Sequence, residues 1–217
     1  MRSRRQTPWT WPGAAVAAGL VACVATATGC AVKAGDGTSN SYVIVDSLLG
    51  ASGAAATVFS GTIASDVETI VTREIGGQMQ TVSTVFEDIG QVTFRLGLRD
   101  PGTAATPTAP TTSNFVTLTR YHVAFTRSDG RNTPGVDVPA PFDGAMTVTV
   151  RELPVSASFA IVRAQAKTQA PLVALVGGGA AAAIATIAEV TFTGTDQTGR
   201  EVTVTGRIGV TFSDWAD

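Results

Sequence analysis

A strict alternation of apolar and polar residues near the C-terminal end of the chain most constrains the fold. Between residues 202 and 212 the large apolar side chains fall at even positions: Val202, Val204, Ile208, Val210 and Phe212. Successive side chains of a β-strand point to opposite faces, so this period of two predicts a strand with one buried face. Gly206 and Gly209 interrupt the pattern and predict a bend or a bulge.

Shorter runs of the same alternation recur along the chain after residue 40. They predict further strands over residues 41–48, 92–98, 116–126 and 146–150 and around 190–192. Within one of these runs, Val116 and Leu118 lie in the opposite phase to Tyr121. One extra residue near Thr119 would restore the phase, so a bulge is predicted there.

Turn-forming residues separate these runs. Gly76-Gly77, Ser128–Gly130 and Asp196–Gly199 have the residues that tight turns require, and they predict short connections between strands. Residues 101–114 are rich in Thr and Pro and are expected to form an exposed connection. Residues 132–144 hold three prolines and two glycines, which exclude a central strand and favour a shaped loop or an edge.

Two segments allow a second interpretation. Residues 65–68 have the form of a helix-capping box, but the β-branched residues that follow favour a strand, which is our prediction. Residues 168–188 carry no charge and are long enough to span a membrane. Pro171 and Gly177–Gly179 oppose a helix there, so we expect a short buried segment, a glycine loop and a strand, with a membrane span as the alternative.

The N-terminal segment has the layout of a secretory signal, with arginines at positions 2, 4 and 5 followed by an uncharged stretch over 13–29. A transmembrane anchor is the alternative. Ala27-Thr28-Gly29-Cys30 resembles the lipobox of bacterial lipoproteins, in which the cysteine receives a diacylglycerol and becomes the mature N-terminus. Cys23 follows Leu20-Val21-Ala22, which matches the leucine preference of that family better, and Cys23 is the alternative lipidation site.

These signals divide the chain into a cleaved signal peptide (1–29), a flexible tether (30–40) and one domain (41–217). Cleavage removes three of the 15 basic residues and none of the 17 acidic ones, which leaves a net charge of -5. Because there is no basic excess, we expect no nucleic-acid partner. Only 15 % of the residues are charged and 44 % are hydrophobic, which excludes a disordered chain.

The patterns predict an all-β chain of about nine strands in an antiparallel sandwich. The strand before Asp196–Gly199, that turn and the long strand after it resemble the closing hairpin of bacterial immunoglobulin-like surface domains. The segment Ser41–Leu48 is similar to the first strand of uncharacterised bacterial lipoproteins built on such a sandwich. The resemblance implies an antiparallel immunoglobulin-like β-sandwich preceded by the cleaved signal peptide.

The residues offer little catalytic chemistry. His122 is the only histidine and is expected on the polar face of a strand, where a hydrolase site would have to be built around it. The chain has no G-x-S-x-G sequence, and a zinc helix of the H-E-x-x-H type would need a second histidine. Glu87-Asp88 is the only adjacent acidic pair and is expected to cap a tight turn. We therefore predict a protein that is not an enzyme and has no cofactor.

A weak candidate for a Ca²⁺ site consists of oxygen-bearing residues in one loop-rich stretch, namely Asp129, Asn132, Asp137 and Asp143. Turn formation explains the same residues, so no metal is predicted. Arginines are expected on polar strand faces, where they would pair with acids or bind acidic ligands: Arg95, Arg99, Arg120, Arg127, Arg151 and Arg207.

The sequence thus predicts a lipid-anchored protein of the bacterial cell envelope, on its periplasmic or cell-surface face. Its expected partners are the membrane, through the N-terminal lipid, and a protein or glycan ligand at the loops. The expected role is that of a non-enzymatic binding or structural module. The alternatives are a hydrolase around His122 and a subunit of a surface assembly formed by strand pairing.

Overall fold

Ten β-strands make up most of the described chain, which the computed structural model covers over residues 37–179 and 182–215. The strands are β1 (Ser41–Ala51), β2 (Thr62–Asp66), β3 (Thr69–Ile75), β4 (Gln78–Thr84), β5 (Asp88–Leu98), β6 (Val116–Thr126), β7 (Phe142–Val150), β8 (Val155–Val162), β9 (Ile184–Asp196) and β10 (Glu201–Ser213). The helical segments are short: η1 (Gly53–Ala55), η2 (Thr112–Asn114), α1 (Ala164–Lys167) and η3 (Leu172–Leu175). The predicted all-β class is confirmed.

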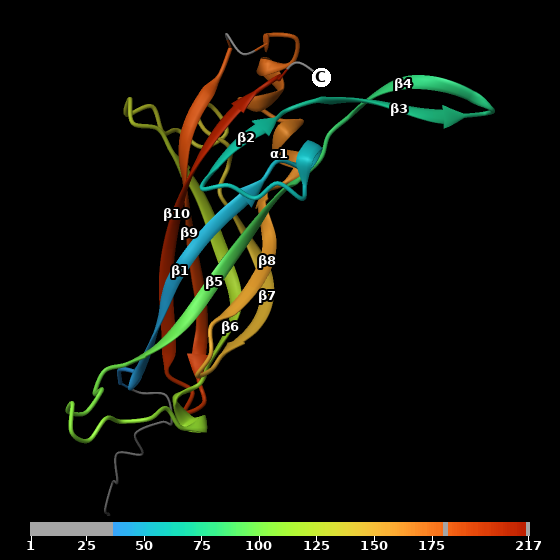
Figure 1. Cartoon of the computed structure of the whole chain (residues 1–217). Coiled ribbons are helices and arrows are strands. Elements are labelled where there is room, and N and C mark those ends of the chain that lie inside the picture. The colour runs from blue at the N-terminus through green and yellow to red at the C-terminus, as the bar shows by residue number, and fades with distance from the viewer. Residues whose placement is uncertain (1–36, 180–181, 216–217) are drawn as a thin grey trace, which may run out of the picture. The chain divides into compact units, whose positions relative to one another are not determined.

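The strands form two main sheets and a separate two-stranded one (Figure 1). The first sheet has the order β1-β5-β8 and the second has the order β2-β10-β9-β6-β7, while β3 pairs only with β4. All pairs are antiparallel except β2 with β10, which run parallel. The expectation of a purely antiparallel architecture is therefore wrong. After β1 the chain crosses to the other sheet, so β2 joins the edge of β10 in the same direction instead of folding back on β1.

Aromatic side chains from both main sheets meet in one core. Phe94 of β5 packs edge-to-face against Phe192 of β9, with ring centroids 4.9 Å apart. Phe159 of β8 meets the same ring of Phe192 at 5.3 Å and Tyr121 of β6 at 5.0 Å. Such pairs each add about 1 kcal/mol beyond the burial of their area. These contacts hold the three-stranded sheet against the five-stranded one.

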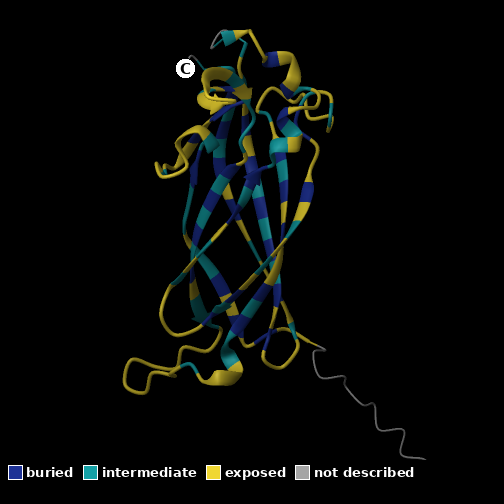
Figure 2. Cartoon of the chain, turned by 90° about the vertical axis from the view of Figure 1, so that its right-hand side faces the viewer, coloured by how far each residue is buried: buried dark blue, intermediate teal, exposed yellow. Residues whose placement is uncertain are grey.

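The apolar residues of the predicted alternation face the interior between the sheets, and the polar residues face outward, as the bands of buried and exposed residues in Figure 2 show. Along β10, Val202, Ile208 and Phe212 are buried. The register of β10 with β9 runs without a break, so of the bend or bulge predicted at its glycines, the bulge is wrong. Gly206 instead lies against Leu48 of β1, which leaves little room for a side chain.

The bulge predicted near Thr119 is confirmed. The register of β6 with both neighbouring strands shifts between Leu118 and Arg120. Gly194 of β9 faces this irregularity, and a Cβ atom placed on it would overlap the backbone of Thr117 and Leu118. Only glycine lets the two backbones approach so closely.

The predicted turns are confirmed as well. Gly76 and Gly77 connect β3 to β4 with φ angles of 62° and 79°, which side-chain-bearing residues rarely adopt. The helix considered for residues 65–68 is wrong, because β2 ends at Asp66 and β3 begins at Thr69. The loop over 132–144 gives way to an edge strand, β7, at Phe142, as expected.

The uncharged stretch over 168–188 has the predicted order of elements where it is described. Leu172 and Leu175 of η3 are buried, glycines follow, and β9 begins at Ile184. Among the described residues, no helix has the length and apolar character needed to cross a membrane. The short helix α1 directly before this stretch was not expected from the sequence.

The close approach at Gly194 gives the first test. Gly194→Ala should lower the free energy of unfolding by about 2–3 kcal/mol, because the new methyl group meets backbone that cannot rotate away. Gly209→Ala is the control, since its Cβ would lie 3.4 Å from Thr62, an ordinary contact. Urea unfolding of both variants measures the difference, and equal stabilities would contradict this account of the bulge.

Candidate functional site

The four residues considered as Ca²⁺ ligands do not converge on one point. Asp129 forms ion pairs with Arg127 and Arg131, at 2.6 and 2.9 Å. Hydrogen bonding to Arg127 holds the pKa of the Asp129 carboxyl well below its usual value. Within the described part of the chain, no group of three or more histidine, cysteine or acidic residues could hold a metal ion.

The other three candidates stabilise their own loop or strand edge. The Asn132 side chain accepts a hydrogen bond from the backbone N–H of Arg127, and Asp137 accepts one from the backbone N–H of Thr133. Asp143 lies on β7, opposite His122. The contacts of Asn132 and Asp137 are the ones that turn-forming residues make, while Asp143 makes a cross-strand contact.

His122 lies on the exposed face of β6, as predicted. Its Nδ1 atom is 3.0 Å from Oδ1 of Asp143, its register partner on β7. This pair supplies two members of a hydrolytic triad, but no serine hydroxyl of the described residues forms a hydrogen bond with His122. Both side chains of the pair lie on an exposed strand face.

Two of the arginines named from the sequence form the cross-strand ion pairs that were predicted. Arg95 of β5 lies 3.1 Å from Asp46 of β1, and Arg207 of β10 lies 2.6 Å from Glu189 of β9. Both pairs are exposed, and such pairs contribute less than about 1 kcal/mol each. They belong to the solvated sheet surface.

The strongest electrostatic feature is an ion pair that the sequence did not reveal. Nζ of Lys167 lies 2.7 Å from Oδ1 of Asp88, and both side chains are almost fully buried, at 1 % and 0 % exposure. Lys167 also donates to the backbone carbonyl of Asp66 at 2.7 Å. Asp88 accepts further hydrogen bonds from the Ser65 hydroxyl and the Gly53 N–H. Both charges therefore have several partners, which a buried ion pair requires.

The expectation that Asp88 caps a tight turn is wrong. Asp88 is the first residue of β5 and points into the interior, where Lys167 of α1 reaches it. Burial raises the pKa of Asp88 above its ordinary value, while Lys167, Ser65 and Gly53 oppose that effect. The adjacent acid Glu87 is exposed, so the two neighbours have different environments.

The ion pair joins the two ends of the β3–β4 hairpin. Asp66, the last residue of β2, lies three positions before the hairpin begins at Thr69, and Asp88 lies four positions after it ends at Thr84. Lys167 bonds to both positions, so it ties together the chain segments that enter and leave the hairpin. The Asp66 carboxylate also accepts a hydrogen bond from Thr69, the first residue of β3.

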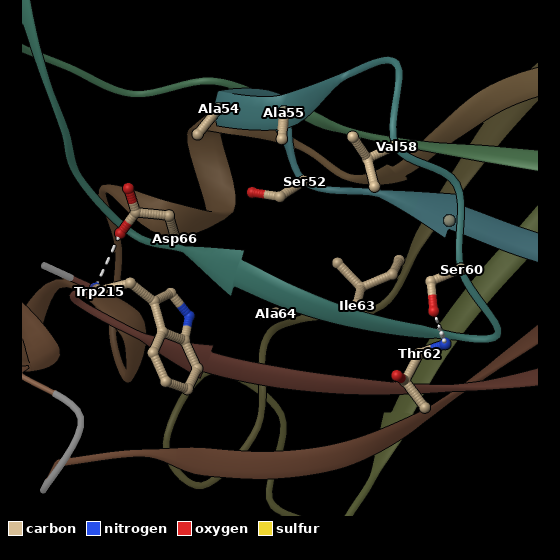
Figure 3. Close-up of a pocket in the computed structure, with 11 residues that line it drawn as sticks. Ser52, Ala54, Ala55, Val58, Ser60, Thr62, Ile63, Ala64, Asp66 and Trp215 are labelled. Carbon is tan, nitrogen blue, oxygen red and sulfur yellow. Dashed lines mark hydrogen bonds between the residues drawn. The ribbon is translucent and has the colours of Figure 1, made fainter. Parts of the chain in front are cut away.

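An apolar pocket of about 350 Å³ lies beside this network, at the end of β2 (Figure 3). Its wall is formed by small and apolar residues from the end of β1, from η1 and from β2, together with Trp215: Gly50, Ser52, Ala54, Ala55, Val58, Ser60, Thr62, Ile63, Ala64, Asp66 and Trp215. This volume is at the lower end of the range found for small-molecule sites.

The hydrogen bonds of Trp215 give the pocket a defined shape, and the Ser52 hydroxyl is a polar group beside it. The Trp215 indole N–H donates to the Ser65 carbonyl, and its backbone N–H donates to the Asp66 carboxylate. The Ser52 hydroxyl oxygen is buried and has no hydrogen-bond partner in the described structure. In Figure 3 this hydroxyl points toward the side of the pocket where Asp66 and Trp215 lie. The pocket therefore has mostly apolar walls, with an unpartnered hydroxyl buried beside them.

Cys30 and Cys23, the two lipidation candidates, lie outside the described residues, as does the predicted signal peptide over 1–29. The last residues of the predicted tether are described: the side chain of Arg99 donates to the Ser39 carbonyl, and its backbone N–H donates to that of Asn40. The tether therefore reaches the domain at the end of β5.

Comparison of the chain with protein-family models, with curated proteins and with solved structures finds no match. The chemistry of the pocket and of the buried ion pair is therefore what bears on function.

The ion pair predicts strongly coupled substitutions. Lys167→Met and Asp88→Asn should each lower the free energy of unfolding by about 3–5 kcal/mol, because each leaves the other partner buried without its counter-charge. The double variant removes both charges, and the amide introduced at position 88 keeps an oxygen for the Gly53 N–H and an NH2 group that can donate to the Ser65 hydroxyl, so it should lose much less than the sum of the single losses. Urea unfolding of the four proteins measures the coupling, and additive losses would show that the charges do not depend on each other.

Proposed function

We propose that this protein is a lipid-anchored, non-enzymatic binding module of the bacterial cell envelope. The proposal combines the basic and apolar N-terminal segment, the lipobox-like residues before Cys30 and a β-rich domain that follows a short tether. Cleavage before Cys30 would make that cysteine the mature N-terminus. A diacyl anchor with a further amide-linked chain would then hold the domain firmly at the membrane surface.

We propose further that the domain is an immunoglobulin-like β-sandwich. Two packed sheets with a shared aromatic core support this assignment, as does the long closing hairpin of β9 and β10 around Asp196–Gly199. Sandwiches of this kind carry binding sites at their ends, where loops are free to vary. The pocket beside Trp215 lies at such an end, between η1 and the last residues of β2.

The apolar pocket is the single observation that carries the binding role. Its walls are formed by alanine, valine, isoleucine and tryptophan side chains, which favour an apolar group over a charged one. The Ser52 hydroxyl, buried beside the pocket without a partner, would supply one hydrogen bond to a polar end of the ligand once its side chain turns to meet that end. We therefore propose a small amphipathic ligand, with an aliphatic or aromatic body and one polar group. No cofactor, metal or bond-breaking chemistry is needed for this role.

The anchor is tested by replacing the cysteines one at a time in the full chain expressed in a bacterium. Cys30→Ala should lose both the added lipid mass and membrane attachment, because its thiol is the proposed acceptor, while Cys23→Ala should keep both. Intact mass and membrane fractionation are the measurements. The reverse result would assign the lipid to Cys23, and no loss in either variant would refute a cysteine-linked anchor.

The pocket is tested by using Trp215 as its own reporter. The other two tryptophans, Trp9 and Trp11, lie in the predicted signal peptide and are replaced by phenylalanine so that Trp215 alone emits. 1-Octanol, an uncharged aliphatic chain with one polar end, should change the intensity and wavelength of this emission in a saturable manner, because it would exclude water from the indole.

Two alanine variants make the pocket measurement specific. Ala55→Phe fills the pocket and should abolish the saturable signal. Ala105→Phe adds the same side chain to the exposed connection between β5 and β6, outside the pocket lining, and should leave it unchanged. Binding that survives Ala55→Phe would place the ligand elsewhere.

A further inference from the structure

The β3–β4 hairpin, residues 69–84, is an arm that leaves the two packed sheets (Figure 1). Its strands contact each other and make at most marginal contact with the other elements. Most of its residues are exposed, on both faces, while Thr69 at its base is buried. The exposed side chains include Met79 and Ile75, at 69 % and 43 % of their full accessible area. The arm therefore buries little apolar surface of its own.

Such an arm is poorly supported as an isolated element. A two-stranded hairpin is only marginally stable in water, and three or more strands are needed for a sheet that stands alone. Lys167 fixes the base of this arm through Asp66 and Asp88, but it makes no contact with the outer half. Added strands along the arm would supply the missing hydrogen bonds and apolar contacts.

The outer edge of β4 is the open side of the arm. Gln78–Thr84 contains no charged residue and no proline, and its register with β3 is uninterrupted from Thr69–Thr84 to Ile75–Gln78. Charges, prolines and bulges are the devices that protect sheet edges from pairing. The arm's other strand, β3, carries Arg73 and Glu74.

The edges of the main sheets differ from β4. The strand β1 has a bulge between Val45 and Ser47, β7 faces the bulge of β6, and β2 pairs over only five residues. The remaining edge strand, β8, lies beside β7. Among the described strands, β4 thus combines length, regular register, exposure and lack of charge at an edge.

We propose that the arm is a dimerisation element, in which the β4 edges of two copies of this chain pair antiparallel about a twofold axis. The result is a four-stranded sheet in the order β3-β4-β4-β3, which exceeds the strand number needed for independent stability. With Thr81, the middle residue of β4, on the axis, Gln80 lies opposite Val82 and Met79 opposite Ser83. This arrangement places Thr81 opposite its own copy, and a strand without charged residues meets no like-charge repulsion in such a self-pairing.

The positions for the test follow from the register. Thr81 on β4 is the register partner of Thr72 on β3, and both are exposed. Because Gly76-Gly77 forms a two-residue turn, its flanking pair is hydrogen-bonded, and alternation along the hairpin directs the N–H groups of Thr72 and Thr81 outward. Equivalent substitutions at these positions therefore disturb the hairpin equally but affect opposite edges.

The first measurement is the mass of the full chain by sedimentation equilibrium in density-matched detergent. The wild type should be a dimer at high concentration. Thr81→Pro removes an outward donor from β4 and should raise the dissociation constant by more than about tenfold. Thr72→Pro removes the matching donor from β3 and should leave the dimer intact. A monomeric wild type, or equal effects of the two prolines, would overturn the proposal.

A second pair of variants avoids the conformational restriction of proline. Thr81→Lys places two like charges on the twofold axis and should weaken the dimer about fivefold at low salt, with recovery at high salt. Thr72→Lys should leave the dissociation constant of the dimer unchanged at both low and high salt. Circular dichroism and thermal unfolding verify that all variants remain folded. A dissociation constant of the Thr81→Lys dimer that does not change with salt would exclude pairing between two copies. The same conclusion would follow if one copy of the chain were found bound to a different protein instead of to a second copy.

Discussion

The buried ion pair between Lys167 and Asp88 is the interaction on which one end of the molecule depends. It connects the short helix after β8 to the start of β5, and through the Asp66 carbonyl it also holds the end of β2. These three segments are far apart in the sequence. Because each charge has lost its water, neither can be removed without leaving the other in an apolar environment.

Asp66 links this pair to the pocket and to the β3–β4 arm in the same region. Its carbonyl accepts from Lys167, its carboxylate accepts from Trp215 and Thr69, and it forms part of the pocket wall. The pocket and the base of the β3–β4 arm are therefore held by one residue and its partners. A rigid base lets an arm with little packing of its own keep a defined direction, and the same contacts fix the Trp215 indole, which lines the pocket.

Much of the fold could be predicted because one-sided burial leaves a period of two in the sequence. The β10 pattern, the phase change before Tyr121 and the Gly76-Gly77 turn each correspond to observed elements. The predictions that failed concern relations between strands. The parallel position of β2 depends on where the chain crosses between sheets, and the role of Gly206 depends on Leu48 of another strand. Neither the position of β2 nor the role of Gly206 can be predicted from the local alternation of apolar and polar residues.

The candidate site was less accessible to sequence reasoning, and Lys167 shows why. It is the only charged residue between Arg163 and Glu189, which singles it out in the sequence. The neighbouring residues, however, give no indication that Asp88 is its partner. The sequence by itself determined the strands, the turns and the uncharged character of β4, because these follow from backbone geometry and neighbouring side chains. Only the tertiary structure decided which strands share a sheet, which acid loses its water and where the pocket opens. Those outcomes depend on contacts between residues distant in the chain.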